Sequence, residues 1–530
     1  MPKLLKLLLI AAFFNALSWI VVIPIWQYPD EQAHFAQVQD VAELGYVPFE
    51  KNASREIDLS EQILGTKRDS FGNNKFTYHP EYKIDYSDSY IGLHELEISN
   101  LPKSARTELV KQESTNNPPL YYFLASIAYK IFYSGDLFTR VYAVRFLSVI
   151  LFIGTIILSF KIGQIIFKNQ KYLQLVLLSL VAFKPMLVFA STGVLPDVLT
   201  NLLFTLVIFI GLKAIEDGFN KALVVLSIIT IVAGVMTRQQ FLIAVIILFF
   251  PIIYQALINH KKAKKSFFIL LSIVVFIGFA NAFGTQIPII SSFRFQDDTY
   301  PNISLFFRKD FFDYLVSMIR ENYAQIWPWY WGIYKWLSLA YPIIIYRIIN
   351  IIVGSAIIGI ITKILLVIKN KRFDKNFILF TFLLYSSIIY YLIIISWDYL
   401  FRIRSGFSFG IQGRYLFPLI TAHMCIILIG TWQITESLFR KYGAFIIFVL
   451  VILMVLFNSY SLFYVSSHYY DTSKLSVFLK QASQYKPLIV KGNIILLIML
   501  MNFLFQIFFF YKIGGFLLNK NTLDSNSHTH

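Results

Sequence analysis

The sequence has few charged residues and almost no cysteine. Only 15% of its 530 residues are charged, whereas a soluble domain carries roughly a quarter. The single cysteine, Cys425, excludes a disulfide framework and a thiolate metal site. No glycine-rich phosphate-binding loop and no GxSxG motif occurs in the chain. These absences argue against a soluble enzyme of the P-loop or α/β-hydrolase class.

Apolar residues are abundant instead, making up 57% of the chain, and the mean hydropathy is +0.62. They form long runs, each close to the roughly 20 residues that cross a bilayer as a helix. We therefore predict an all-α polytopic membrane protein. The twelve predicted spans are 4–26, 141–160, 172–190, 195–215, 222–237, 239–258, 266–286, 341–368, 377–396, 414–433, 443–464 and 490–515.

The net charge of +17 comes from short basic clusters between apolar runs, at 161–171, 260–265, 369–375 and 440–441. Such clusters are typical of cytoplasmic loops and do not indicate nucleic-acid binding. The apolar segment Leu120–Tyr133 is too short to span, and only if it lies along the outer face do all these clusters share the side of Lys3 and Lys6. We predict a multi-pass protein of the cell membrane with both termini cytoplasmic.

This topology divides the chain into alternating membrane and external regions. An uncleaved first helix (1–26) precedes an acidic external loop with juxtamembrane helices (27–140), since no small-residue cleavage site is present. Spans 2–7 (141–286) lead to a second, aromatic-rich external loop (287–340). Spans 8–12 (341–515) include the short external loops 397–413 and 465–489, and a cytoplasmic tail (516–530) follows. The predicted chemistry therefore faces outward.

The sharpest local motif directly follows the first span. Pro29, the acids after it and Gly45 predict a helix over 29–44, on which Asp30 and Glu31 share a face with His34. Two carboxylates and a histidine can provide a general base and candidate ligands for Mg²⁺ or Mn²⁺. The alternative is that the acids only favour the positive end of the helix dipole.

Two further polar positions lie at predicted membrane boundaries. Asn117 opens the interfacial segment within Asn-Asn-Pro-Pro-Leu-Tyr-Tyr, where prolines at a helix start are also ordinary structure. Asp197 lies at the outer mouth of the 195–215 span, where an acid needs solvent or a partner. A simple N-cap of that helix would explain Asp197 equally well.

Several arginines are predicted to lie outside, against the prevailing charge bias. They are Arg238, Arg402, Arg404 and Arg414. Guanidinium groups match phosphate oxygens in bidentate geometry, so a lipid-linked phosphate is one partner that would explain them. Anionic head groups, or loop acids such as Asp398, are the alternative.

Taken in order, these motifs resemble the GT-C superfamily of membrane glycosyltransferases. Within it, Pro29-Asp30-Glu31 with His34-Phe35, and Gln412-Gly413-Arg414-Tyr415-Leu416 with Pro418, resemble the DUF2142 family. The Asn117–Tyr122 motif, Arg145 and Pro196-Asp197 fall in the expected order between them. The resemblance covers about residues 26 to 420 and departs at Gln32 and at 193–195.

The resemblance implies an external glycosyltransferase that uses a polyprenyl-phosphate-linked sugar and a glycan, lipid or cell-wall acceptor. It carries the catalytic acid over to Asp30, with Glu31 beside it, and one-step displacement predicts inversion. The leaving phosphate needs cations, for which we expect Arg414, then Arg238 and Arg404. Predicted substrate-binding residues are His34, Asn117, Asp197, Trp329 and Trp331; the alternative for the two tryptophans is that they anchor the chain at the membrane interface.

Three other functions remain open. A transporter or flippase of lipid-linked substrates would also be polytopic, but it should carry acids near the bilayer midplane. A lipid-linked glycan polymerase or ligase would share the outward arginines without a first-loop carboxylate. A non-catalytic assembly subunit would tolerate Asp30→Asn without loss of function.

Overall fold

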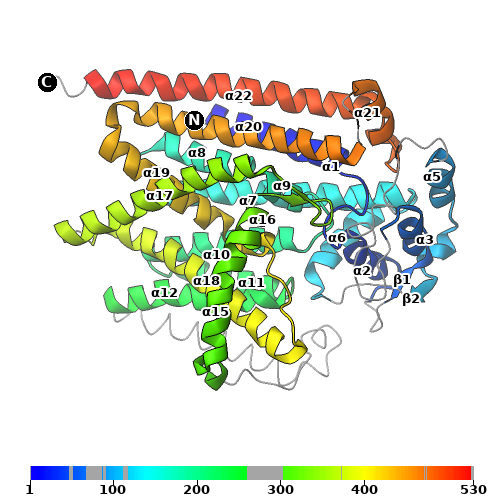
Figure 1. Ribbon diagram of the computed structural model, residues 1–530, viewed down its shortest axis with the longest axis horizontal. Coiled ribbons are helices and arrows are strands. Elements are labelled where there is room, and N and C mark those ends of the chain that lie inside the picture. The colour runs from blue at the N-terminus through cyan, green and yellow to red at the C-terminus, as the bar shows by residue number, and fades with distance from the viewer. Residues whose placement is uncertain are drawn as a thin grey trace.

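The computed structural model describes residues 2–46, 52–66, 86, 91–111, 117–258, 303–371, 373–470, 472 and 474–526. Within these ranges the chain is mostly helical, and its only sheets are two ribbons of two short strands each. Many of the long helices run side by side along the longest axis of the molecule (Figure 1). The predicted all-α polytopic membrane fold is confirmed.

Nine helical segments of the described chain are long and apolar enough to cross a membrane. They are built on α1 (Pro2–Val22), α7 (Leu137–Ile166), α10 (Asp197–Asp217), η3 (Gln239–Leu242) with α12 (Ile243–Ile258), α17 (Ile343–Asn370), α18 (Lys375–Ser405), η7 (Gly413–Leu419) with α19 (Ile420–Leu438), η8 (Arg440–Tyr442) with α20 (Gly443–Tyr470), and α22 (Asn493–Asn526). Each of the nine coincides with a predicted span.

Three predicted spans have a different outcome. The 222–237 span is the shorter helix α11 (Lys221–Val235), and 266–286 lies outside the described residues. The 172–190 span is divided into α8 (Lys171–Ala182) and α9 (Pro185–Ala190). Lys184 adopts an extended conformation there because the following proline disfavours the helical one. The total of twelve spans therefore stays a prediction.

The described part of the first loop gathers at one end of the bundle (Figure 1). Its elements are α2 (Glu31–Glu43), β1 (Asn52–Ser54), α3 (Arg55–Ile63), α5 (Ile91–Ser99), η2 (Lys103–Arg106), β2 (Leu109–Lys111) and α6 (Leu120–Ile131). β1 and β2 pair antiparallel, with Ala53 opposite Val110. On α7, the buried Arg140 bonds Glu56 of α3 and the Tyr129 hydroxyl of α6, at 2.5 Å for the latter. These bonds fasten the loop helices to the bundle.

Helix α6 is the segment that the charge pattern predicted to be interfacial. Twelve helical residues extend only about 18 Å, too short for the hydrocarbon layer. Tyr121, Tyr122 and Tyr129 are buried toward α2 and α7, while Phe123 and Ile131 are exposed. One buried face and one exposed apolar face suit a helix that lies along a membrane surface.

The described part of the second predicted loop begins at residue 303 and contains short elements. They are η5 (Ile303–Phe307), α15 (Lys309–Glu321), the π-helical turn η6 (Asn322–Ile326), α16 (Trp327–Trp331), and the ribbon of β3 (Ile333–Tyr334) with β4 (Leu339–Ala340). Between α20 and α22 lie α21 (Leu475–Ala482) and η9 (Leu488–Val490). Trp336, at the tip of the ribbon, donates from Nε1 to the Trp26 carbonyl just beyond α1, at 3.0 Å. The second loop thus contacts the start of the first.

The orientation of the bundle in the membrane gives a testable prediction. Cys425 is buried and should not react with a maleimide. Single cysteines can therefore be introduced in place of the exposed residues Tyr46 and Lys441 and labelled in sealed cells. We expect an impermeant maleimide to label position 46 from outside and position 441 only after permeabilisation, because basic clusters stay in the cytoplasm. Labelling of 441 from outside would contradict the topology.

Candidate active site

Four charged side chains from four distant segments meet beyond the end of α1. The Arg414 guanidinium lies 3.1 Å from Oδ2 of Asp30 and 3.4 Å from Oδ2 of Asp197. Arg238 lies 2.7 Å from the other oxygen of Asp197. We call Asp30, Asp197, Arg238 and Arg414 the acid–arginine cluster. It is a chain of alternating charges that no contiguous sequence motif contains.

The four members differ in their access to solvent. The side chain of Arg414 is 5% exposed, Asp197 16%, Arg238 23% and Asp30 35%. A group that exchanges a proton with a substrate must be reachable, so Asp30 is the best placed of the two acids. The nearly buried Arg414 can act on a negative charge bound beside it with little screening by water.

Backbone geometry explains the position of Asp30. Its φ of 55° is left-handed, so α2 begins at Glu31 and not at Pro29 as predicted. Its carboxylate makes no N-cap bond to α2 and is held by Arg414 instead. Asp197 likewise is the first residue of α10, with Pro196 at the cap position. The N-cap explanation offered for Asp197 is therefore wrong, whereas Asp30 and Glu31 do lie at the positive end of the α2 dipole.

Glu31, next in sequence, points the other way into the protein. It is fully buried, and Arg145 of α7 bonds its two oxygens at 2.8 and 2.6 Å. The same oxygens accept from the backbone N–H of Trp26 at 3.0 Å and of Val194 at 3.2 Å. Arg145 also donates to the Ile23 carbonyl. The predicted catalytic role of Glu31 does not fit this geometry, since its oxygens are already hydrogen-bonded and are inaccessible to solvent.

His34 and Asn117 meet at one tyrosine. The Nδ1 atom of His34 lies 2.8 Å from the Tyr122 hydroxyl, and the Asn117 amide donates to the same hydroxyl at 3.2 Å. The Gln37 side chain pins the Asn117 backbone, donating to its carbonyl at 2.7 Å and accepting from its N–H at 3.2 Å. These bonds hold the start of α6 against α2.

Burial lowers the pKa of His34 to about 3, and the positive charge of Arg238 acts in the same direction. The imidazole is therefore neutral at physiological pH and offers hydrogen bonds without a charge. Among the smaller influences, the charges of Asp30 and Asp197 raise its pKa and that of Arg414 lowers it.

The predicted metal ligands do not fit a common ion. Arg145 occupies Glu31 and Tyr122 contacts His34, while Asp30 faces Arg414. In the part of the chain that the structure describes, no group of three or more His, Cys, Asp or Glu side chains is arranged to hold a metal. Because a divalent cation of this type requires several oxygen ligands, the three-residue Mg²⁺ or Mn²⁺ site is not supported by this geometry.

Comparison with known proteins identifies a family. Its model, described as "Predicted membrane protein (DUF2142)", matches residues 13–422. The chain belongs to the DUF2142 family. The matched region contains the whole acid–arginine cluster, and the resemblance to the DUF2142 family is confirmed. A search of curated proteins finds no match.

Two solved structures are similar to this DUF2142 protein. The archaeal oligosaccharyltransferase AglB from Archaeoglobus fulgidus, described in complex with an inhibitory peptide and a dolichol-phosphate, has 12% identity and a TM-score of 0.44. That match covers 88% of this chain but 56% of AglB, so the chain spans little more than half of that protein's length. ArnT from Cupriavidus metallidurans has 11% identity and a TM-score of 0.38, with 88% and 74% of the two chains covered.

The remaining predicted site residues of this DUF2142 protein lie around the cluster or apart from it. α16 packs against η7, which carries Arg414. Trp331 is buried there, Trp329 is half-buried, and their predicted contact with sugar stays a prediction. Arg404 is exposed in the last turn of α18, and its phosphate role also stays a prediction. Asp398 accepts from the Tyr314 hydroxyl at 2.8 Å.

The sequence does not predict the partners of two buried cations, Arg145 and Lys184. Arg145 was placed within a predicted span without a partner, and Lys184 was not singled out at all. A charge inside an apolar run is itself a signal, because an isolated charge is costly in the bilayer. That signal identifies both residues but not their partners, which are 114 and 146 positions away in sequence.

Proposed function

We propose that this DUF2142 protein is an inverting glycosyltransferase acting on the outer face of the membrane. Its donor would be a sugar linked through phosphate to a polyprenyl chain, and its acceptor a hydroxyl of a glycan, lipid or cell-wall polymer. The observation that carries the proposal is the acid–arginine cluster, which joins one solvent-reachable carboxylate to two arginines beyond the end of an apolar bundle.

The proposed reaction is one displacement at the anomeric carbon. Asp30 accepts the proton of the acceptor hydroxyl as its oxygen forms the new bond to that carbon. The bond from the carbon to the phosphate oxygen breaks on the opposite face, and the polyprenyl phosphate leaves with the electron pair. Arg414 and Arg238 stabilise the charge that develops on that phosphate.

The pairing of acids with arginines supports this division of roles. Arg414 bridges Asp30 and Asp197 and is almost covered, so its guanidinium has a set direction before a donor arrives. Gln412 accepts from Nε of Arg414 at 2.8 Å and helps to hold that direction. A preorganised cation stabilises developing charge without further reorganisation.

Arg414→Lys tests the phosphate role. Lysine keeps the positive charge but cannot bridge two partners with a planar fork. In membranes supplied with a polyprenyl-phosphate sugar, we expect the donor concentration for half-maximal transfer to rise about tenfold or more, which corresponds to about 1.4 kcal/mol. The maximal rate should change less.

Arg440→Lys is the matched control, because Arg440 is exposed in η8 and lies outside the cluster. Its donor dependence should equal that of the unmodified protein. An unchanged donor dependence in Arg414→Lys would remove Arg414 from the phosphate site. Absence of any donor-dependent transfer by the unmodified protein, across a panel of such donors, would contradict the proposed function itself.

A further inference from the structure

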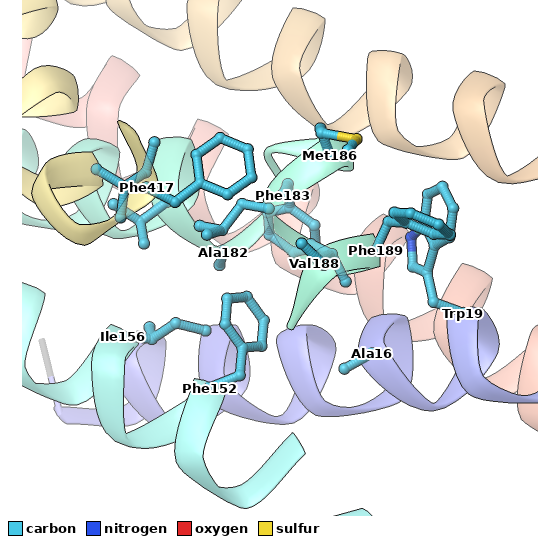
Figure 2. Close-up of a cluster of buried hydrophobic side chains, with 14 of the residues drawn as sticks. Ala16, Trp19, Phe152, Ile156, Ala182, Phe183, Met186, Val188, Phe189 and Phe417 are labelled. Carbon is cyan, nitrogen blue, oxygen red and sulfur yellow. The ribbon is translucent and has the colours of Figure 1, made fainter. Parts of the chain in front are cut away.

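A buried lysine lies where the α8–α9 segment is interrupted. Lys184 follows Phe183 and precedes Pro185, and its side chain is inaccessible to solvent. Figure 2 shows apolar side chains of α1, α7 and η7 gathered around this junction, among them Trp19, Phe152 and Phe417. An ammonium group in such surroundings is costly unless specific partners compensate it.

The partners of Lys184 come from the second loop and from η7. Its ammonium donates to the carbonyl oxygen of Tyr330. It also lies 3.9 Å from the ring centre of Tyr330, 4.7 Å from that of Trp331 and 4.8 Å from that of Phe417. Aromatic faces attract cations, most strongly where water is excluded. The lysine therefore ties α16 and η7 to the α8–α9 junction at one point.

The same helix α16 contacts η7 on both sides of Arg414. Before it, Gly413 approaches α16 so closely that a Cβ would lie 2.1 Å from the Tyr330 nitrogen. After it, the Phe417 ring lies 5.5 Å from the Tyr330 ring, centre to centre. The backbone that carries Arg414 is thus held between two contacts with Tyr330, and Lys184 holds Tyr330.

We propose that Lys184 is a positioning residue that keeps the Arg414 guanidinium directed at Asp30 and Asp197. The inference deepens the proposed function and rests on it for the identity of the anion that Arg414 binds. A neutral side chain of similar length would fill the space but would lose both the bond to the Tyr330 carbonyl and the attraction of three ring faces. The η7 segment would then be less restrained, and anion binding at Arg414 would weaken.

The first measurement needs no substrate. Hydrogen exchange of peptides that cover Gly413–Leu419 should be faster in purified Lys184→Met than in the unmodified protein, because the opening of η7 becomes easier. Tyr330→Phe is the matched control, since it keeps the ring and the carbonyl and loses only the contact of its hydroxyl with His423, at 3.1 Å. Its exchange in η7 should match the unmodified protein.

The second measurement is the binding of farnesyl phosphate, a short polyprenyl phosphate, to the protein in nanodiscs. We expect the Kd to rise about tenfold in Lys184→Met, which corresponds to about 1.4 kcal/mol. If Lys184 acts only through Arg414, Lys184→Met should cause little further loss in an Arg414→Gln background. Phe417→Leu, which keeps an apolar side chain, serves as the second variant should Lys184→Met not fold, with the same expectations.

The possible outcomes separate the two proposals. Unchanged exchange of η7 in folded Lys184→Met, or in Phe417→Leu where only that variant folds, overturns the positioning role whatever the ligand is. Losses of binding that simply add in the double variant also overturn it. Faster exchange of η7 together with an unmodified protein that binds no farnesyl phosphate supports the positioning role and contradicts the proposed donor class.

Discussion

Replacing Asp30 with Asn is expected to lower the rate of sugar transfer by about 10²- to 10⁴-fold, the usual contribution of a general base. Asparagine has nearly the same shape but cannot accept the proton of the acceptor hydroxyl. Because the effect is on the chemical step, the loss should persist at saturating donor. The rate would be measured as transfer of labelled sugar from a polyprenyl-phosphate donor in membranes that contain equal amounts of folded protein.

Asp197→Asn is the matched control for that experiment. Both substitutions remove a carboxylate that faces Arg414, but Asp197 is 16% exposed, against 35% for Asp30, and also pairs with Arg238. We expect a much smaller effect on the maximal rate and a larger one on donor dependence. Full turnover by Asp30→Asn would exclude Asp30 as the base. Equal losses in both variants would show that the charge balance of the cluster, and not proton transfer, is what matters.

Glu31→Gln is expected to reduce stability more than most substitutions, by about 3–5 kcal/mol, because it leaves a buried arginine without its counter-charge. Arg145 is fully buried, and its guanidinium also lies 4.6 Å from the ring centre of Tyr28, so it cannot turn to solvent without disturbing the core. The change should be measured as the shift of the denaturant midpoint in micelles.

The double variant Glu31→Gln with Arg145→Met provides the control. Removing both charges of a buried pair costs much less than removing one, so the double variant should be more stable than Glu31→Gln alone. If Glu31→Gln unfolds at the same denaturant concentration as the unmodified protein, the pair does not stabilise the fold as described. A variant with normal stability and no transfer would return Glu31 to the list of catalytic candidates.

Much of the architecture was predictable from local properties of the chain. The nine candidate spans of the described residues coincide with apolar runs, and α6 is as short as the charge pattern required. The boundary of α2 was not predicted, because the local sequence pattern does not indicate that Asp30 is left-handed. Pro185 was a sequence signal for the break between α8 and α9 at Lys184. The apolar residues on both sides of it nevertheless led to the prediction of one continuous span.

The site was predictable as a set of residue types but not as a set of partners. The sequence indicated that the four residues of the acid–arginine cluster lie on one side of the membrane. The structure links them through three ion pairs of 2.7 to 3.4 Å, Arg238–Asp197, Arg414–Asp197 and Arg414–Asp30. The grouping of Asp30, Glu31 and His34 as metal ligands is not supported. Their side chains contact three different partners: Arg414, Arg145 and Tyr122.

The sequence by itself determined that this protein is a helical membrane protein and that its acidic motif follows the first span. Hydrophobic length and charge placement decide both, and they are local properties of the chain. Only the tertiary structure decided which of two adjacent acids is available for chemistry. Asp30 and Glu31 are chemically alike. Arg145 binds the Glu31 carboxylate inside the protein, whereas Arg414 binds the Asp30 carboxylate where solvent can reach it. That difference arises from segments more than 100 residues away.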